Sequence, residues 1–243
     1  MPAFGWRARI GLISPGTSGI HTSALEMEML APDGVIFISR FLDGPRSLGL
    51  DDLRAMLPQI APAAHVIAAT PDVDVILVAG APIVLANGSD RIIGAITKET
   101  GLPATTNVAA IVAGLRRLGI GRVAVHAPYY PAEIADLMRA HLDGAGIDVA
   151  SVLDGSGVDF EGHKDVSPQD TYRKAKRAFL ETGGAEGLVL VGGGAPLHDV
   201  IAVLERDIGA PVIANNFAAL WHALVMAHVR EPIEGYGVLL SSL

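Results

Sequence analysis

The sequence predicts an α/β protein with two similar lobes, and two observations carry that prediction. Short apolar runs typical of buried strands alternate with segments of helical spacing along the 243 residues. A Gly-Ala-Pro turn also follows a buried-strand pattern twice, at 80–82 and at 194–196. Ligands of open α/β sheets bind where strands end and helices begin, so we expect one site in the cleft between the lobes.

In the first half, the expected strands are short runs of Val, Ile and other apolar residues bounded by turn residues. Strands are expected at 9–13, 34–38, 73–78 and 103–106, and helices at 51–69, 90–100 and 108–118. Prolines at 58 and 62 can split the first of these helices. Asn107 is expected to cap the third.

The second half repeats the alternation. Strands are expected at 122–125, 147–152, 188–191 and 211–213, and helices at 131–145, 168–182, 197–207 and 217–228. One helix start is well marked, because Ser167 stands in the cap position and Pro168 in the first helical position. Asn215 and Asn216 are expected to cap the last helix.

Matching motifs recur in the same order and at near-constant spacing in the two halves, which indicates an internal duplication. The alternative is a chance likeness between strand–loop–helix units. We expect the first lobe to comprise residues 1–118 and 215–243, with the last helix crossing back onto it. Residues 119–214 would form the second lobe.

Composition restricts the function. Eighteen basic and 26 acidic residues give a formal net charge of −8, and no basic run favours nucleic acid. Without cysteine there are no disulfides, thiolate metal sites or thiol nucleophiles. No run approaches the ~18 apolar residues of a membrane span, and His, Asp and Glu lack paired metal-ligand spacing. We therefore expect a cytoplasmic protein without metal, nucleic-acid or membrane partners, and a homo-oligomer through the apolar last helix is possible.

Five motifs, each weak alone, occur in order along nearly the whole chain. They are Ile10 to Pro15, Val123 to Tyr129, Ser167-Pro168 with Tyr172-Arg173, Gly209 to Val212, and Gly235-Tyr236-Gly237. Together they resemble the aspartate/glutamate racemase superfamily, and within it arylmalonate decarboxylase and maleate cis-trans isomerase. The resemblance implies two pseudo-symmetric Rossmann-like (flavodoxin-like) lobes, a small carboxylate as ligand, and catalysis without a cofactor.

The resemblance also shows what this chain lacks. Racemases and maleate isomerase use two cysteines, one at each strand-end turn, and the decarboxylase keeps only the second. These positions fall on Gly80 and Gly192. The hydroxyl-bearing positions after the first turn fall on Ala81 and Pro82, whereas the family tyrosine is retained as Tyr129. Racemisation or isomerisation by two thiols is therefore excluded.

The candidate site residues follow from these turns. The substrate-binding candidates are Pro15, Gly16, Thr17 and Ser18 in the first loop, Gly80, Ala81 and Pro82, Tyr129, and Gly192, Gly193 and Gly194. The hydroxyls and backbone N–H groups there could bind an anion, although ordinary turns also use these residues. Tyr129, His126 and His198 are the catalytic candidates. The alternatives are packing histidines and an aromatic plug between the lobes.

Three functions remain open at this point. The leading one is a cofactor-independent enzyme on a small carboxylate. It would be decarboxylase-like, on a substituted malonate, or isomerase-like, with a non-thiol acid or base. The second is a carboxylate-binding protein that kept the pocket and lost the chemistry. The third is a hydrolase or lyase that uses a water held by the glycine turn.

Overall fold

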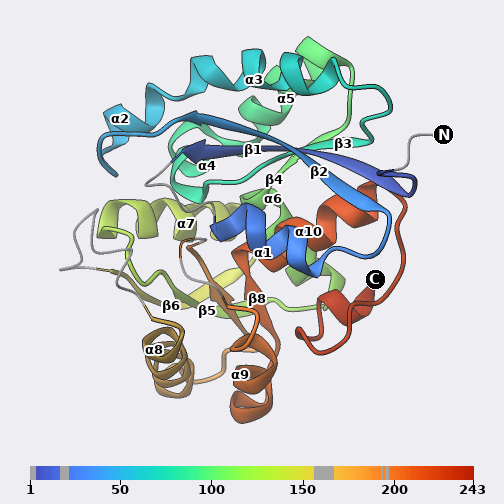
Figure 1. Ribbon diagram of the computed structural model, residues 1–243. Helices are drawn as coiled ribbons and strands as arrows, with labels where there is room; N and C mark the ends of the chain where they lie inside the picture. The colour runs from blue at the N-terminus through green and yellow to red at the C-terminus, as the bar shows by residue number, and fades with distance from the viewer. Residues whose placement is uncertain (1–3, 17–21, 156–166, 193, 195–196) are drawn as a thin grey trace.

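Two parallel four-stranded sheets form the framework of the protein (Figure 1). The computed structural model describes residues 4–16, 22–155, 167–192, 194 and 197–243. The strands are β1 (Ala8–Gly16), β2 (Val35–Asp43), β3 (Val75–Val78), β4 (Ala104–Thr106), β5 (Arg122–His126), β6 (Asp148–Leu153), β7 (Gly187–Leu190) and β8 (Val212–Ala214). The sheet orders are β2-β1-β3-β4 and β6-β5-β7-β8. The predicted fold of two α/β lobes is confirmed, and the shared strand order agrees with the duplication.

Helices cover both faces of each sheet, which is why the inner strands are continuous apolar runs. Every residue of β3 and of β7 is buried. The α-helices are α1 (Thr22–Leu30), α2 (Leu50–Arg54), α3 (Ile60–Ala68), α4 (Ala81–Asn87), α5 (Ser89–Thr100), α6 (Asn107–Arg117), α7 (Ala132–Gly144), α8 (Pro168–Glu181), α9 (Ile201–Ile208) and α10 (Asn215–Met226). In Figure 1, α2, α3 and α5 lie outside the first sheet, α8 and α9 outside the second, and α6 and α10 between them.

The last helix links the two halves. α10 leaves the second sheet directly after β8 and then packs along α6, and it reaches β3 and β4 of the first sheet. This is the path expected for a helix that crosses back. The exact lobe boundaries stay a prediction.

Several element boundaries differ from the sequence prediction, each for a local reason. The helix expected at 51–69 is split into α2, a 3₁₀ turn (Leu57–Gln59) and α3, because Pro58 interrupts the helical hydrogen bonds. Thr106, rather than Asn107, caps α6, and its hydroxyl accepts from Ala109 N at 3.0 Å. α10 begins at Asn215 itself, without a side-chain cap. α9 begins at 201 rather than 197, after a turn.

The first strand runs further than expected, through Pro15 to Gly16. β1 pairs with β2 over its whole length, whereas its pairing with β3 ends at Ile13. Pro15 therefore lies where no ladder partner on the β3 side requires its missing N–H.

Helix α1 was not predicted, because its apolar residues lie on both its buried and its exposed face. Leu25 and Met29 are 58% and 56% exposed, whereas Glu26 between them is 4% exposed. The residues buried on the same side as Glu26 are Ala24, Met27 and Leu30. Apolar residues therefore lie on both faces of the helix, and periodicity gives little signal. Ala, Leu, Glu and Met are nevertheless strong helix formers, so intrinsic propensity was the available signal.

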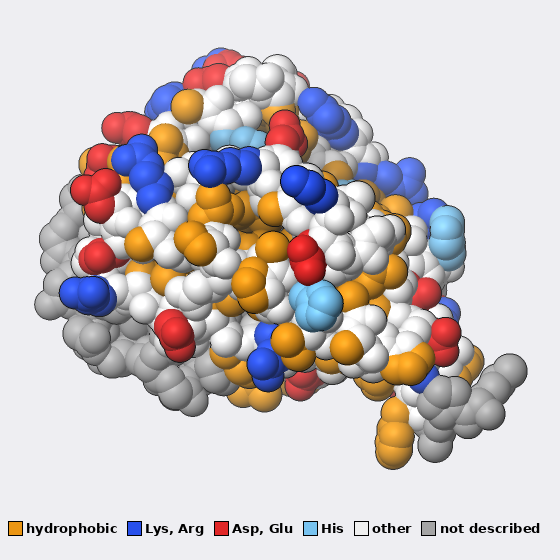
Figure 2. Space-filling model, turned by 90° about the horizontal axis from the view of Figure 1, so that it is seen from above, with side chains coloured by type: hydrophobic (Ala, Val, Ile, Leu, Met, Phe, Trp, Pro, Cys, Tyr) orange, Lys and Arg blue, Asp and Glu red, His pale blue; other side chains and the backbone are white. Residues whose placement is uncertain are grey.

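The outer face of the first lobe carries charges of both signs. Figure 2 shows basic and acidic side chains interspersed with apolar ones over the side that bears α3 and α5. His65 of α3 and Glu99 of α5 approach to 3.0 Å there. In the part of the chain that the structure describes, no helix has the length and apolar character to cross a membrane.

The two helix caps provide a matched test of buried polar contacts. Thr106 is fully buried and also bonds Ser89 Oγ at 2.7 Å, whereas the cap at Ser167 serves only Asp170 N, at 3.1 Å. Thr106→Val should lower the free energy of unfolding by about 2–3 kcal/mol, because it leaves two buried groups unsatisfied. Ser167→Ala should cost about 1 kcal/mol. Urea denaturation measures both, and equal losses would contradict this account.

Candidate functional site

The first predicted turn brings Pro15 and Gly80 together at the carboxyl edge of the first sheet. Gly80 follows β3 and adopts φ 112°, a region that L side chains rarely enter. A Cβ on Gly80 would lie 2.9 Å from Pro15 Cδ. Ala81 and Pro82 are buried in the first turn of α4. Gly16 lies against the backbone of Leu42, where a Cβ would come within 2.7 Å of the carbonyl oxygen.

The second turn brings Tyr129, Gly192 and Gly194 together at the carboxyl edge of the second sheet. Gly194 N donates to Tyr129 Oη at 2.6 Å. Gly192 has φ 122°, and a Cβ there would lie 2.7 Å from Tyr129 Oη. The tyrosine ring therefore occupies the space that a side chain at position 192 would need. Thr17, Ser18 and Gly193 lie outside the described residues.

Tyr129 is enclosed, and its phenol is neutral. Its ring meets that of Tyr130 edge to face at 5.1 Å. Burial raises the pKa of Tyr129 well above its usual value, and the charge of Glu26 raises it further, against the hydrogen bond from Gly194. A phenol in this state does not serve as a base near neutral pH. Near neutral pH, the hydroxyl of Tyr129 can therefore only form hydrogen bonds.

Glu26 of α1 is the feature that the sequence did not reveal. Its Oε1 accepts from Leu197 N at 2.6 Å and from His198 N at 3.0 Å. Its Oε2 accepts from Asn216 Nδ2 of α10 at 2.8 Å. A buried carboxylate is stable only with such donors. Glu26 thereby joins the first lobe's α1 to the segment that follows the second turn.

His198 is the predicted catalytic residue that lies beside this carboxylate. Its Nδ1 is 3.6 Å from Glu26 Oε1, and its Nε2 is 3.5 Å from Asp199 Oδ2. A carboxylate thus faces each ring nitrogen. The imidazole is partly exposed, so protons can exchange with solvent.

His126 has a different environment. The residue is 1% exposed, and its Nδ1 lies 3.3 Å from the carbonyl oxygen of Leu153. Burial lowers the pKa of His126 to about 4, which the contact with Leu153 opposes and the charge of Lys174 on α8 reinforces. The imidazole is therefore neutral near pH 7 and cannot act there as an acid. Its catalytic role stays a prediction.

Glu26 and Asn216 were missing from the predicted site for a physical reason. Both act through long-range contacts, 171 and 190 residues apart in sequence, that no local pattern encodes. One sequence signal could have pointed to Glu26: it is a glutamate in a run of strong helix formers directly after the glycine-rich first loop. In the described ranges, no group of three or more His, Asp or Glu side chains could hold a metal ion.

Comparison with known proteins places the chain in a family of α/β proteins that is named after a decarboxylase. The sequence model of the arylmalonate decarboxylase family matches residues 10–240, and the chain belongs to that family. Arylmalonate decarboxylase of Bordetella bronchiseptica is 30% identical over 133 residues. That match spans 55% of this chain and 55% of the relative, about half of its length.

Solved structures show the same fold over almost the entire chain. A crystal structure of arylmalonate decarboxylase has a TM-score of 0.83 at 26% identity, covering 97% of this chain and 100% of that one. The maleate isomerase Iso from Pseudomonas putida has a TM-score of 0.85 at 22% identity, covering 96% and 98%. Maleate cis-trans isomerase of Nocardia farcinica, bound to TRIS, has a TM-score of 0.86 at 23% identity over the same shares.

The contact between Gly192 and Tyr129 predicts a large cost for any side chain at this turn. Gly192→Ala should lower the free energy of unfolding by roughly 2–5 kcal/mol, through backbone strain and overlap with the ring. Gly209 is the matched control, because it also has positive φ, 66°, but open space around its Cβ position. Gly209→Ala should cost only about 1–2 kcal/mol. Similar losses in urea denaturation would show that Tyr129 does not restrict position 192.

The burial of His126 predicts a pH-dependent stability. Its pKa is about 4 in the folded protein, against an ordinary value of 6.5, so the unfolded chain binds the proton more strongly. The titration of His126 therefore leaves the free energy of unfolding unchanged above pH 6.5. The free energy of unfolding decreases by about 3 kcal/mol as the pH falls from 6.5 toward 4.

The stability difference between the native protein and His126→Phe, followed by urea denaturation from pH 7 to 4, measures this loss. His65→Gln, at an exposed histidine, is the control and should change by less than about 1 kcal/mol over the same range. A difference for His126→Phe that stays constant with pH would refute the buried neutral state.

Proposed function

We propose that the chain is a cofactor-independent enzyme that acts on a small carboxylate, with His198 as its proton-transferring group. Decarboxylation of a substituted malonate is the first reaction to consider, and isomerisation is the second. The observation that carries this proposal is the cluster of Glu26, His198 and the Tyr129–Gly194 turn, in a chain of the arylmalonate decarboxylase family.

The proposed substrate contacts follow from the second turn. One carboxylate of the substrate would lie beside Tyr129 and the backbone of the 192–194 turn. Glu26 already occupies the N–H groups of Leu197 and His198, so the substrate does not bind those donors. The substrate carboxylate would therefore bind beside Tyr129 and Gly192, and not at the start of the 197–200 turn.

The proposed chemistry balances without a thiol. The bond between the α-carbon and one carboxylate breaks, CO₂ leaves, and the electron pair delocalises onto the remaining carboxylate. The imidazolium of His198 then gives its proton to the α-carbon and regains one from water. Tyr129 stabilises the enediolate by hydrogen bonding, since its raised pKa keeps it protonated. Glu26 accepts the backbone N–H of His198 and lies 3.6 Å from its Nδ1, so its charge would favour the imidazolium.

Incubation with a panel of substituted malonates in deuterated buffer tests this function. We expect CO₂ release and one deuterium at the α-carbon of the product. His198→Gln should reduce kcat by about 10²–10⁴-fold. His65→Gln is the matched control, at an exposed histidine on α3, and should retain full activity. Absence of both turnover and deuterium uptake across the panel would overturn the enzymatic proposal.

A second candidate function is a carboxylate-binding protein without chemistry. Gly80 and Gly192, at the expected thiol positions, both have positive φ, and a Cβ at either would come within 3 Å of a neighbouring ring, which favours this candidate. It predicts a carboxylate that raises the melting temperature without being converted. Tyr129→Phe should weaken that shift, whereas Tyr172→Phe on α8 should not.

A further inference from the structure

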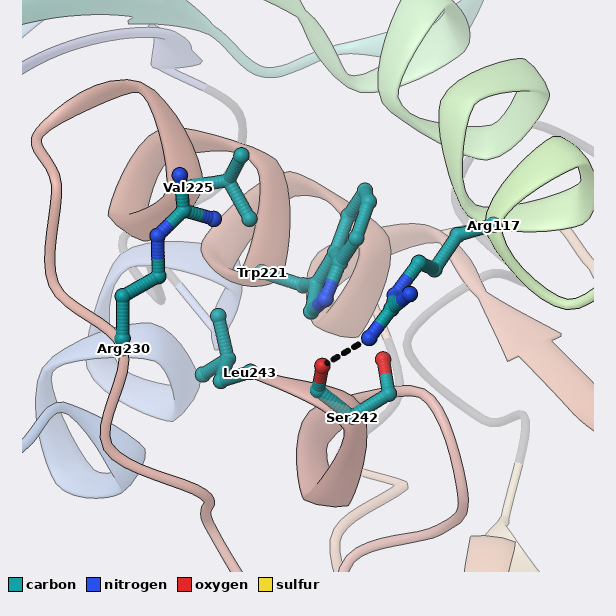
Figure 3. A pocket seen from close by; sticks show the side chains of 6 residues that line it. All are labelled: Arg117, Trp221, Val225, Arg230, Ser242 and Leu243. Carbon is teal, nitrogen blue, oxygen red and sulfur yellow. Dashed lines mark hydrogen bonds between the residues drawn. The ribbon is translucent and has the colours of Figure 1, made fainter.

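A pocket lies on the side of α10 near the end of the chain, and the proposed function does not use it. It has a volume of about 450 Å³ and is lined by Arg117, Trp221, Val225, Arg230, Ser242 and Leu243 (Figure 3). Pockets of 300–1,000 Å³ commonly hold small molecules. Trp221 and Val225 come from α10, and Arg117 is the last residue of α6.

The charge of this pocket is unbalanced. Two of its six lining side chains are arginines, and no lining side chain is acidic, although the chain as a whole carries a net charge of −8. In the described part of the chain, neither arginine forms an ion pair. Arg117 donates from Nη2 to the carbonyl oxygen of Ser242 at 2.9 Å, which leaves further guanidinium donors for a ligand.

The floor of the pocket supplies an aromatic surface and a buried donor. Trp221 is 5% exposed, and its Nε1 has no hydrogen-bond partner among the described residues. Figure 3 shows the indole between the two arginine side chains, with its nitrogen on the side of Ser242. A buried donor without an acceptor costs about 1–3 kcal/mol, so an acceptor placed there would be stabilising.

We propose that this pocket binds a small organic anion, a carboxylate with a flat apolar body. The body would stack on Trp221 against Val225 and Leu243, and the carboxylate would bind the guanidinium groups of Arg117 and Arg230. Arginine binds carboxylates through paired N–H donors, which suits both residues to this role. The binding is independent of the reaction proposed for the cleft.

The chain offers a direct optical test, because Trp6 and Trp221 are its two tryptophans and Trp6 is 65% exposed. In a Trp6→Phe background, Trp221 reports on the pocket alone. Titration with benzoate should change its fluorescence to saturation, and added salt should weaken the binding, because both arginines are solvent-exposed. Benzamide, the uncharged analogue of equal shape, should bind at least about 10-fold more weakly.

Variants separate this pocket from the cleft. Arg230→Gln should weaken benzoate binding by about 10-fold or more, since one charged contact is lost. Arg91→Gln, at an exposed arginine on α5, and Tyr129→Phe, in the cleft, should leave the titration unchanged. The proposal is overturned by a flat titration, by equal binding of benzamide, or by unchanged affinity in Arg230→Gln.

Discussion

The buried carboxylate of Glu26 is the interaction on which the arrangement of the site depends. An ionised carboxylate removed from water costs several kcal/mol unless donors replace its hydration. Leu197 N, His198 N and Asn216 Nδ2 supply those donors, and they come from two segments of the chain that are distant from α1 in sequence. The requirement to satisfy one charge therefore fixes α1, the start of the 197–200 turn and α10 relative to one another.

The same requirement explains why α1 exposes Leu25 and Met29. The orientation of this nine-residue helix turns Glu26 inward together with Ala24, Met27 and Leu30. Burial of Leu25 or Met29 in its place would gain about 1.5–3 kcal/mol of apolar transfer but would leave the donors at 197, 198 and 216 without an acceptor. The orientation adopted therefore satisfies the polar donors and still keeps an apolar face of the helix in the core.

Most of the framework could be predicted from sequence because it follows local rules. The buried strands, the Ser167 cap and the break at Pro58 each depend on residues close together in the chain. Thr106 was not predicted to cap α6, because a threonine in a β-like run is also typical of a strand. Glu26 could not be placed, since its partners become neighbours only when the two sheets are assembled.

Gly80 and Gly192, the two positions where the sequence resemblance leads one to expect thiols, differ in what surrounds them. At Gly80 the neighbour is the edge of a proline ring, and a small shift of that ring could relieve the contact. At Gly192 the neighbour is Tyr129, whose hydroxyl is fixed by Gly194 N and whose ring is buried. A thiol at position 192 would have to displace this tyrosine or distort the turn. The inward position of Tyr129 and the glycine at 192 therefore depend on each other.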